Sequence, residues 1–355
     1  GILPQVHLKL NFSNPDDSEF DNLLNIIISS QNEINNEIAI DAIDYLFAPW
    51  VLNNYRRILK KKINNYLNVY GIFNYINIKK IEELIDKEYN LDFDLYRYEQ
   101  YLLNPTTKNF FKQAFQDTLN ELSDLVNRMF KRLLNALQKN EERDLKYTLS
   151  FGSNDTQIGM YINNAFINIL KNINYLSSLH FIFKIRKDLN EKLLEEIINL
   201  IINQKNISLA FIDTTYNNDG IEYFENGIRI LENYNSDRSE ANGRLVVNTT
   251  SINLARLALK NKEKSLKEFY DNLDEQMELV KNELLLSFEI IGDKNKENYS
   301  ILFNGTIFDD EKLEEKQKIR KVIKSGNLNI GLIGLKECLE YLEPDKTKEY
   351  KLLID

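Results

Sequence analysis

Four polar side chains in the second half of the chain could bind an anionic, hydroxyl-bearing ligand. They are Thr249, Thr250, Ser251 and Asn253. The hydroxyl groups of the first three, together with backbone N–H groups at a helix start, could hold a phosphate. The carboxamide of Asn253 can donate to and accept from sugar hydroxyls. Each feature has a structural alternative: the hydroxyls would cap the helix, and Asn253 would tie the end of a strand to that helix.

These polar residues follow a long loop. Residues 207–258 read as strand, loop and strand, with the loop tip at Glu225-Asn226-Gly227-Ile228-Arg229. Arg229 and Arg244 flank the loop and could bind a phosphate or carboxylate through paired hydrogen bonds, or form ordinary ion pairs. Ile228 is expected to be a buried anchor of the loop, which would contribute roughly 1.5 to 3 kcal/mol if fully enclosed.

The remaining reactive side chains form no recognisable site. Cys338, the one cysteine, lies at helical steps from three leucines, which is the pattern of a buried thiol. His7 and His180 are far apart in the sequence, and no acidic pair frames either of them at ligand spacing. We therefore expect His180 to be a core histidine with satisfied hydrogen bonds, and we expect no metal site and no cofactor.

The composition argues against several classes of protein. The 355 residues have a formal net charge of -9, so general nucleic-acid binding is not expected. A basic cluster at residues 56–62 is expected to be a solvated helix face, with a nucleic-acid patch as the alternative. No apolar run reaches the roughly 18 to 20 residues that span a bilayer, and the start has no signal-peptide pattern. A soluble cytoplasmic protein is therefore expected.

The periodicity predicts two kinds of architecture. Residues 16–140 repeat apolar side chains at helical steps, with a run at 38–47 closed by Ala48-Pro49 and a long helix at 110–137. From residue 146, strands alternate with helices, as in parallel β/α units. We predict one continuous domain over 1–355, mainly helical in 1–145 and β/α in 146–355, with a central loop at 214–247. Strands are expected at 147–151, 180–185, 208–213, 245–254, 301–304 and 328–333, and helices at 158–176, 189–202, 262–288, 310–324 and from 335.

Several segments, in this order, resemble the anaerobic (class III) ribonucleoside-triphosphate reductase family of glycyl-radical enzymes. Residues 31–33 and 41–50, which end in Ala-Pro-Trp, resemble a family segment that ends in Ala-Pro. Residues 149–156 resemble the family's Phe-Gly-Thr-Asp turn, and 180–184 resemble a barrel strand ending in Phe and Lys. Residues 250–256 are similar to its Thr-Ile-Asn-Leu-Pro-Arg motif, with Ala255 where proline is usual, and 330–338 are similar to a later Ile-Gly-Leu-Ala-Glu segment.

The resemblance implies an α/β barrel of ten strands in two parallel halves, with a helical N-terminal layer and the catalytic loop threaded through the centre. In the family, a glycyl radical generates a thiyl on a cysteine at the loop tip, and the thiyl abstracts the 3′-hydrogen of a ribonucleotide. Asn253 stands where the family has an active-site asparagine. Ribonucleotides are then the expected ligands, and a homodimer through helices such as 20–47, or a complementary reductase chain, is the expected partner.

The chain departs from the family pattern where that chemistry occurs. Ile228 stands in Gly227-Ile228-Arg229, where the family has Gly-Cys-Arg, and an aliphatic side chain cannot form a thiyl. In the family, a second cysteine and formate serve reduction. That cysteine is expected on an early strand and has no counterpart here. The sequence up to Asp355 also contains neither the zinc-binding cysteines nor the Arg-Val-x-Gly-Tyr segment of the radical glycine, and it lacks the N-terminal nucleotide-sensing cone.

Three interpretations of function remain. The first is a reductase-like barrel without radical catalysis of its own, including one chain of a split reductase. The second is a non-catalytic barrel, a pseudoenzyme that binds a nucleotide or a partner protein. The third is an unrelated helical α/β interaction protein, which would require the motif matches to be chance. A loop that ends near Ile228 between two strands favours the first two over the third.

Overall fold

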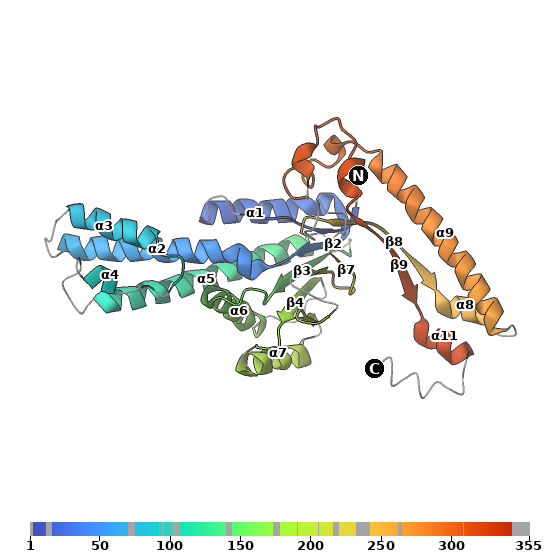
Figure 1. Cartoon of the computed structure of the whole chain (residues 1–355), viewed down its shortest axis with the longest axis horizontal. Helices are drawn as coiled ribbons and strands as arrows, with labels where there is room; N and C mark the ends of the chain where they lie inside the picture. The colour runs from blue at the N-terminus through green and yellow to red at the C-terminus, as the bar shows by residue number, and fades with distance from the viewer. Residues whose placement is uncertain are drawn as a thin grey trace. The chain divides into compact units, whose positions relative to one another are not determined.

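The described strands form one mixed sheet and one separate pair. The computed structural model describes residues 3–11, 16–69, 75–91, 93, 96–99, 101, 107–139, 144–172, 178–189, 191–204, 206–215, 220–231, 242–261, 265–307 and 309–342. In these residues the sheet has seven strands in the order β5-β4-β3-β2-β1-β8-β9, and β6 and β7 form a separate pair (Figure 1). The chain divides into two compact units, a larger one of residues 7–32 and 36–242 and a smaller one of 1–6, 33–35 and 243–355.

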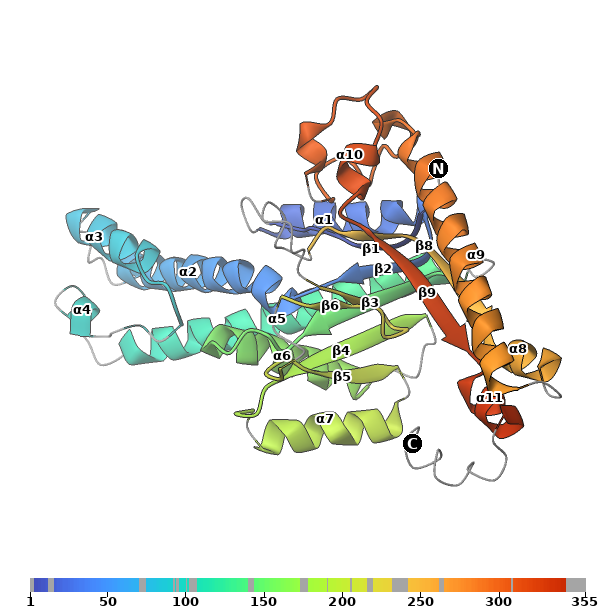
Figure 2. The ribbon, with the colours of Figure 1, turned by 45° about the vertical axis from the view of Figure 1, so that its right-hand side comes forward.

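The strands of the larger unit run parallel. They are β2 (Ile34–Ile40), β3 (Lys146–Phe151), β4 (Leu179–Ile185) and β5 (Ile207–Phe211), each paired with the next (Figure 2). Every residue of β4 is buried, as expected for a parallel strand that is covered on both faces. One of these faces carries the aromatic rings of β3 and β4, which pack against the helices: Phe151 contacts Phe166, and Phe181 contacts Phe130.

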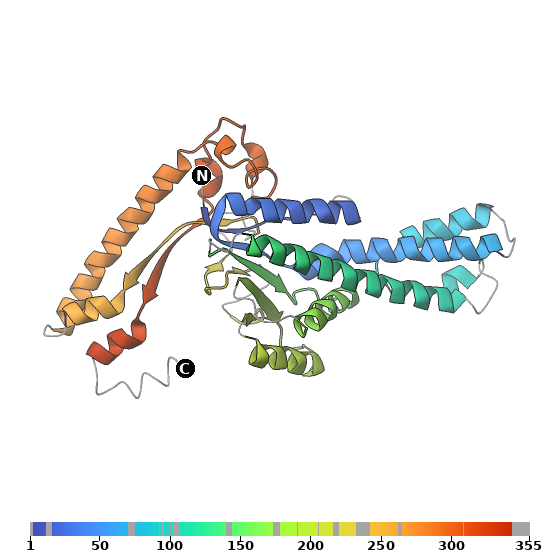
Figure 3. The same cartoon turned by 180° about the vertical axis from the view of Figure 1, so that it is seen from behind.

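The larger unit contains seven α-helices in the described residues. They are α1 (Asp17–Ser29), α2 (Ile43–Val69), α3 (Tyr75–Asp86), α4 (Tyr96–Glu99), α5 (Thr107–Gln138), α6 (Gln157–Leu170) and α7 (Glu191–Asn203). The long helices α2 and α5 lie side by side (Figures 1 and 3). The apolar side of α1, which includes Phe20 and Ile27, is buried in this unit.

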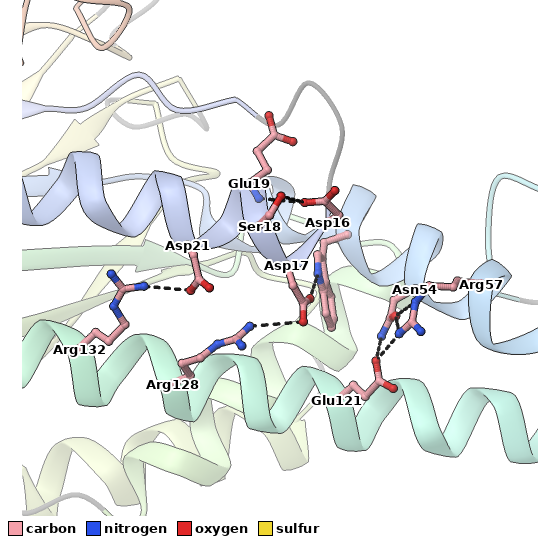
Figure 4. Close-up of polar contacts among 11 residues, drawn as sticks. Asp16, Asp17, Ser18, Glu19, Asp21, Asn54, Arg57, Glu121, Arg128 and Arg132 are labelled. Atoms are coloured by element: carbon pink, nitrogen blue, oxygen red, sulfur yellow. Dashed lines mark hydrogen bonds and ion pairs between the residues drawn. The ribbon is translucent and has the colours of Figure 1, made fainter.

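Polar contacts hold α1, α2 and α5 together (Figure 4). Arg132 of α5 forms an ion pair with Asp21 of α1 at 2.9 Å. Asp17 of α1 accepts a hydrogen bond from the indole N–H of Trp50 in α2 at 3.1 Å. Asn54 of α2 donates to Glu121 of α5 at 2.6 Å. Because each of these bonds joins two different helices, they help to fix how α1, α2 and α5 are aligned.

The smaller unit combines three strands with a long helix. β8 (Leu245–Asn253) pairs antiparallel with β1 (Leu3–His7) and parallel with β9 (Asn327–Ile333). The helix α9 (Leu266–Gly292) packs against β8 and β9 (Figure 3). The remaining helices are the short α8 (Leu254–Lys260), α10 (Arg320–Ile323) and α11 (Leu335–Leu342). The buried core of the smaller unit includes Ile252 of β8, Phe269 of α9 and Cys338 of α11.

Several element predictions are confirmed. The strands expected at 147–151, 180–185, 208–213, 245–254 and 328–333 correspond to β3, β4, β5, β8 and β9. The helix expected at 158–176 is α6, which ends at Leu170; residues 173–177 lie outside the described residues. The ten strands of the expected barrel are not confirmed in the described part of the chain. The single domain over 1–355 stays a prediction.

Three element predictions are wrong. Residues 38–47 are not one helical run, because β2 ends at Ile40 and α2 begins at Ile43 and continues past Pro49. Residues 301–304 form a turn, since the backbone N–H groups of Ile301 and Leu302 donate to the carboxylate of Glu33 rather than to a strand. Residues 310–324 are not one helix; only 310–312 (a 3₁₀ turn) and 320–323 are helical.

Candidate functional site

A short hairpin forms the tip of the central loop in the larger unit. Its strands are β6 (Glu222–Tyr223) and β7 (Arg229–Ile230). The N–H of Gly227 donates to the carbonyl of Phe224 at 2.9 Å, and the N–H of Phe224 donates to the carbonyl of Ile228 at 3.0 Å. Gly227 has φ 80°, the left-handed conformation that a three-residue hairpin loop requires. The predicted loop tip is thus a defined turn.

The buried anchors of the hairpin are not the residue we expected. Phe224 and Ile230 are fully buried, at 1% and 0% exposure, whereas Ile228 is only half-buried. The prediction that Ile228 is the buried anchor is therefore wrong. Ile228 directly follows the left-handed Gly227, and its N–H donates to the side chain of Asn226 at 3.2 Å. The turn places Ile228 at the tip, and the side chains of Phe224 and Ile230 enter the core instead.

The hairpin covers the polar face of the parallel sheet. Alternation along β3 and β4 puts Thr148, Ser150, His180 and Lys184 on the face opposite the aromatic rings. The N–H of Glu225 in the hairpin donates to the carboxylate of Glu37 on β2 at 2.7 Å. Backbone and side-chain contacts therefore fix the hairpin over strands that are distant from it in sequence.

Two buried pairs of ionisable groups lie in this part of the unit. Lys184 Nζ is 2.7 Å from Asp41 Oδ2, and the Lys184 side chain is 0% exposed. His7 Nδ1 is 2.8 Å from Glu222 Oε2. The second pair is close but poorly oriented for a hydrogen bond, because neither ring nitrogen of His7 has a hydrogen-bond partner among the described residues. The first pair is therefore the stronger interaction.

Burial and hydrogen bonds shift the pKa values of several ionisable groups in this part of the larger unit. Burial raises the pKa of Asp41, although the Lys184 ammonium acts in the opposite direction. Burial also lowers the pKa of His180, so the neutral ring is favoured. The pKa of Lys146 is raised mainly by its hydrogen bond to Glu225 in the hairpin. The hairpin thus adds the Glu225 carboxylate to the polar face of the sheet.

Sequence reasoning missed this polar surface. Asp41, Lys184, His7 and Glu222 are far apart along the chain, and none stands at a spacing that suggests a site. The one usable signal was period-two alternation in the strands, which puts polar residues such as Thr148 on one face. The expectation for His180 is confirmed, since Nε2 lies 3.0 Å from the Ser208 hydroxyl and the residue is buried.

A second candidate site is a groove in the smaller unit, at the end of β8. Its volume is about 490 Å³, within the range of small-molecule sites. Two cations of α8, Arg256 and Lys260, line it, and no carboxylate does. Neither cation forms an ion pair with any residue that the structure describes. The other lining residues are Ser251, Ile252, Asn253, Leu257, Asn261, Asn272, Gln276 and Val280.

The comparison with protein families decides what kind of chain this is. A family model described as anaerobic ribonucleoside-triphosphate reductase matches residues 16–353. The chain belongs to the anaerobic ribonucleoside-triphosphate reductase family. No curated protein matches the chain.

Solved structures of anaerobic ribonucleotide reductases share the fold. The Thermotoga maritima enzyme in complex with dATP and CTP matches with a TM-score of 0.54 at 10% identity, over 96% of this chain and 52% of that one. The same enzyme with dATP in the specificity site matches with a TM-score of 0.50 at 10% identity, over 99% and 57%. The chain thus spans about half the length of these reductases.

Two segments with family resemblance meet in the larger unit. The side chain of Asp44, from the segment at 41–50, accepts hydrogen bonds from the N–H groups of Gly152 and Asn154 at 2.9 and 2.8 Å. These two residues belong to the turn that resembles the family's Phe-Gly-Thr-Asp. Burial raises the pKa of Asp44, and the two backbone donors oppose that rise. The reductase-like motifs therefore connect the segments that follow β2 and β3 through hydrogen bonds.

The polar residues predicted from the sequence have different environments in the structure. Asn253 is the N-cap of α8, and its Oδ1 accepts from the N–H of Arg256 at 2.8 Å. This is the structural alternative to ligand binding that the sequence suggested for Asn253. Thr249, Thr250 and Ser251 lie in β8, so the prediction that they cap the helix is wrong. Strand alternation puts Thr250 on the face opposite to Thr249 and Ser251, and only Ser251 and Asn253 line the groove.

The remaining candidates have structural environments. Arg244 is buried and donates to the carbonyl of Ser325 at 2.6 Å, which fits its structural alternative. Arg229 is exposed in β7, opposite Tyr223. Cys338 is buried in the core, and burial raises the pKa of its thiol, as predicted.

The basic cluster at 56–62 forms ion pairs with acidic residues, for example Lys60 with Asp86 at 2.7 Å and Lys62 with Asp117 at 2.8 Å. It is therefore a helix face whose charges are paired.

The described residues contain no group of three or more acidic, histidine or cysteine side chains that could hold a metal ion. They also contain no helix long and apolar enough to cross a membrane.

Proposed function

We propose that this protein is a ribonucleotide-binding member of the reductase family that does not carry out hydrogen abstraction on its own. The observation that carries the binding proposal is the groove at the end of β8, where Arg256 and Lys260 line a polar cavity with no carboxylate. Two cations without ion-pair partners among the described residues favour a ligand with phosphate groups. The ribonucleotide class follows from the family.

The chemistry of Asn253 agrees with this role. Its Oδ1 is occupied by the cap of α8, so its amino group remains to donate to a hydroxyl or phosphate oxygen of the ligand. Ser251 lies on the same face of β8 and lines the same groove. Thr249, Thr250 and Arg229 would have a smaller effect on binding, because they do not line it.

The proposed loss of radical catalysis rests on Ile228. It lies at the tip of a hairpin with defined hydrogen bonds, in the position where the resemblance places the thiyl cysteine. A hydrocarbon side chain offers no S–H bond from which a thiyl could form. Cys338, the chain's one thiol, is buried in the core of the smaller unit.

Calorimetric titration with ribonucleoside triphosphates tests the binding proposal. We expect saturable binding by the whole chain, weakened about tenfold or more when Arg256→Gln removes one charge-assisted contact. Asn253→Ser retains a capping oxygen but loses the carboxamide, so it separates ligand binding from helix capping. Flat titrations with all four ribonucleotides would contradict the proposal.

A second candidate function, a subunit that pairs with a complementary reductase chain, is favoured by β9. Leu332 and Ile333 are 55% and 52% exposed, and one edge of β9 has no partner strand in the described part of the chain. Such an edge can accept a further strand. Mass spectrometry of material that copurifies with the native protein tests this function. Loss of the partner with Leu332→Glu would support it, and a native protein that purifies alone would oppose it.

A further inference from the structure

The long helix α9 of the smaller unit (Figure 2) has three large apolar side chains that are exposed to solvent. Leu279, Leu286 and Ile290 are 61%, 60% and 56% exposed, whereas Val280 and Leu284 of the same helix are buried in the core. The exposed residues are seven and four positions apart, so they lie along one side of the helix over about three turns. We call this row the α9 stripe.

The α9 stripe is a continuous apolar surface rather than a set of scattered side chains. Single exposed apolar residues are common on soluble proteins, but contiguous patches of them mark sites of interaction. The helix packs against β8 and β9 through a different side, which carries its buried residues. The stripe is therefore left over after the core of the smaller unit has formed.

Two acidic side chains flank the stripe. Glu275 and Glu283 lie four residues before and after Leu279, which puts all three on the same side of α9. Both carboxylates are exposed, and neither forms an ion pair with any residue that the structure describes. Glu278, by contrast, points to another side of the helix and forms an ion pair with Lys281 at 3.0 Å. The surface thus combines apolar side chains with uncompensated negative charge.

This combination of charge and hydrophobicity restricts the partner. A second copy of the chain, packed through the same stripe, would bring carboxylates of the two copies together, which is unfavourable. A partner with an apolar face bordered by basic side chains would match both features. A helix fits the shape, because two helices that lie side by side bury side chains spaced three and four residues apart.

We propose that the α9 stripe docks a basic amphipathic helix of a partner protein. The apolar face of that helix covers Leu279, Leu286 and Ile290, and its Lys or Arg side chains reach the two flanking carboxylates. None of the residues of this surface lines the groove at the end of β8. The docking surface is therefore separate from the proposed nucleotide site.

Fluorescence anisotropy on the full chain tests the proposal with a labelled helical peptide of about 18 residues. The probe has leucines on one face and lysines on the other, and the matched control has the same leucines with glutamates in place of the lysines. We expect saturable binding of the lysine peptide, weakened by added salt, and at least about tenfold weaker binding of the glutamate peptide. No binding of the lysine peptide, or equal binding of the two peptides, would overturn the proposal.

The protein side is tested by Leu286→Gln, with Leu285→Gln as the matched control. Leu285 is 49% exposed on the same helix but lies about 100° around it from Leu286, so it is outside the stripe. Leu286→Gln should weaken binding of the lysine peptide about tenfold, and Leu285→Gln should leave it unchanged. Both positions are exposed, and circular dichroism checks that both variants fold. Equal affinities of the two variants would contradict the α9 stripe as the docking site.

Sedimentation of the wild-type chain tests the competing occupant. We expect no self-association that depends on the stripe. A dimer that dissociates in Leu286→Gln and persists in Leu285→Gln would show that a second copy covers the stripe, and would overturn the assignment to a basic helix.

Discussion

Lys184 is a buried cation that forms an ion pair with Asp41. Its ammonium group is fully buried in the larger unit and lies 2.7 Å from Asp41. Burying a charge is costly, and removing one member of a buried pair leaves the other uncompensated. The pair also has a geometric effect, because it ties the residue that follows β2 to β4. The stability of this part of the sheet should therefore depend on both residues together.

Asp41→Ala should destabilise the protein by about 3 to 5 kcal/mol, because it removes the carboxylate that compensates the buried Lys184 charge. Lys184→Met in the same chain removes that charge, so the double variant should be less destabilised than the sum of the two single variants. Urea unfolding of the wild type and the three variants measures this coupling. Strictly additive effects would show that the two side chains do not interact.

His180 gives the protein a predictable pH dependence. Burial lowers its pKa below the ordinary value of 6.5, so the unfolded chain takes up a proton at a higher pH than the folded chain. The contribution of His180 to the free energy of unfolding is therefore complete above pH 6.5. It is lost as the pH falls through 6.5 toward the lower pKa of the folded state. The stability advantage of the wild type over His180→Gln should shrink between pH 7.5 and 5.5. An advantage that grows as the pH falls would contradict the burial argument.

At the scale of elements, the β6–β7 hairpin depends on its turn. Gly227 has φ 80° and nothing lies within 4 Å of a Cβ placed there, so a side chain would meet conformational strain alone. Gly227→Ala should destabilise the protein by about 1 to 2 kcal/mol. Gly227→Asn is the matched control, since asparagine tolerates this conformation, and should cost less in the same urea titration. Equal losses of stability in the two variants would show that the left-handed backbone conformation of Gly227 is not the cause.

The elements also show what the sequence could predict. β8 and β9 were predictable because apolar, β-rich runs sit between turn residues, and α5 because its periodicity is long. β2 was not, since a short apolar run such as Ile38-Ala39-Ile40 fits a strand or a helix equally well. The turn at 301–304 depends on Glu33, which is distant in sequence, so no local pattern revealed it. Of the residues that line the groove, Ser251 and Asn253 were predicted from the sequence as candidate binding residues. Arg256 and Lys260 were not, because only the structure shows that they line the same groove.

At the scale of the whole molecule, charge limits the partners. The formal net charge of -9 and the ion pairs of the basic cluster at 56–62 leave little attraction for a polyanion. We expect no change in the fluorescence anisotropy of a labelled single-stranded DNA when the protein is added at 150 mM salt. Saturable, salt-dependent binding would show a basic surface that the described residues do not provide.

The proposed loss of radical catalysis depends on a hairpin that presents the hydrocarbon side chain of Ile228 where the family has a sulfur. Anoxic incubation of the protein with ribonucleotides, formate and a radical activase is the experiment that decides this proposal. We predict no deoxyribonucleotide above an enzyme-free control, from a preparation that still binds ribonucleotides by calorimetry. Deoxyribonucleotide formed by the wild-type chain above that control would contradict the account.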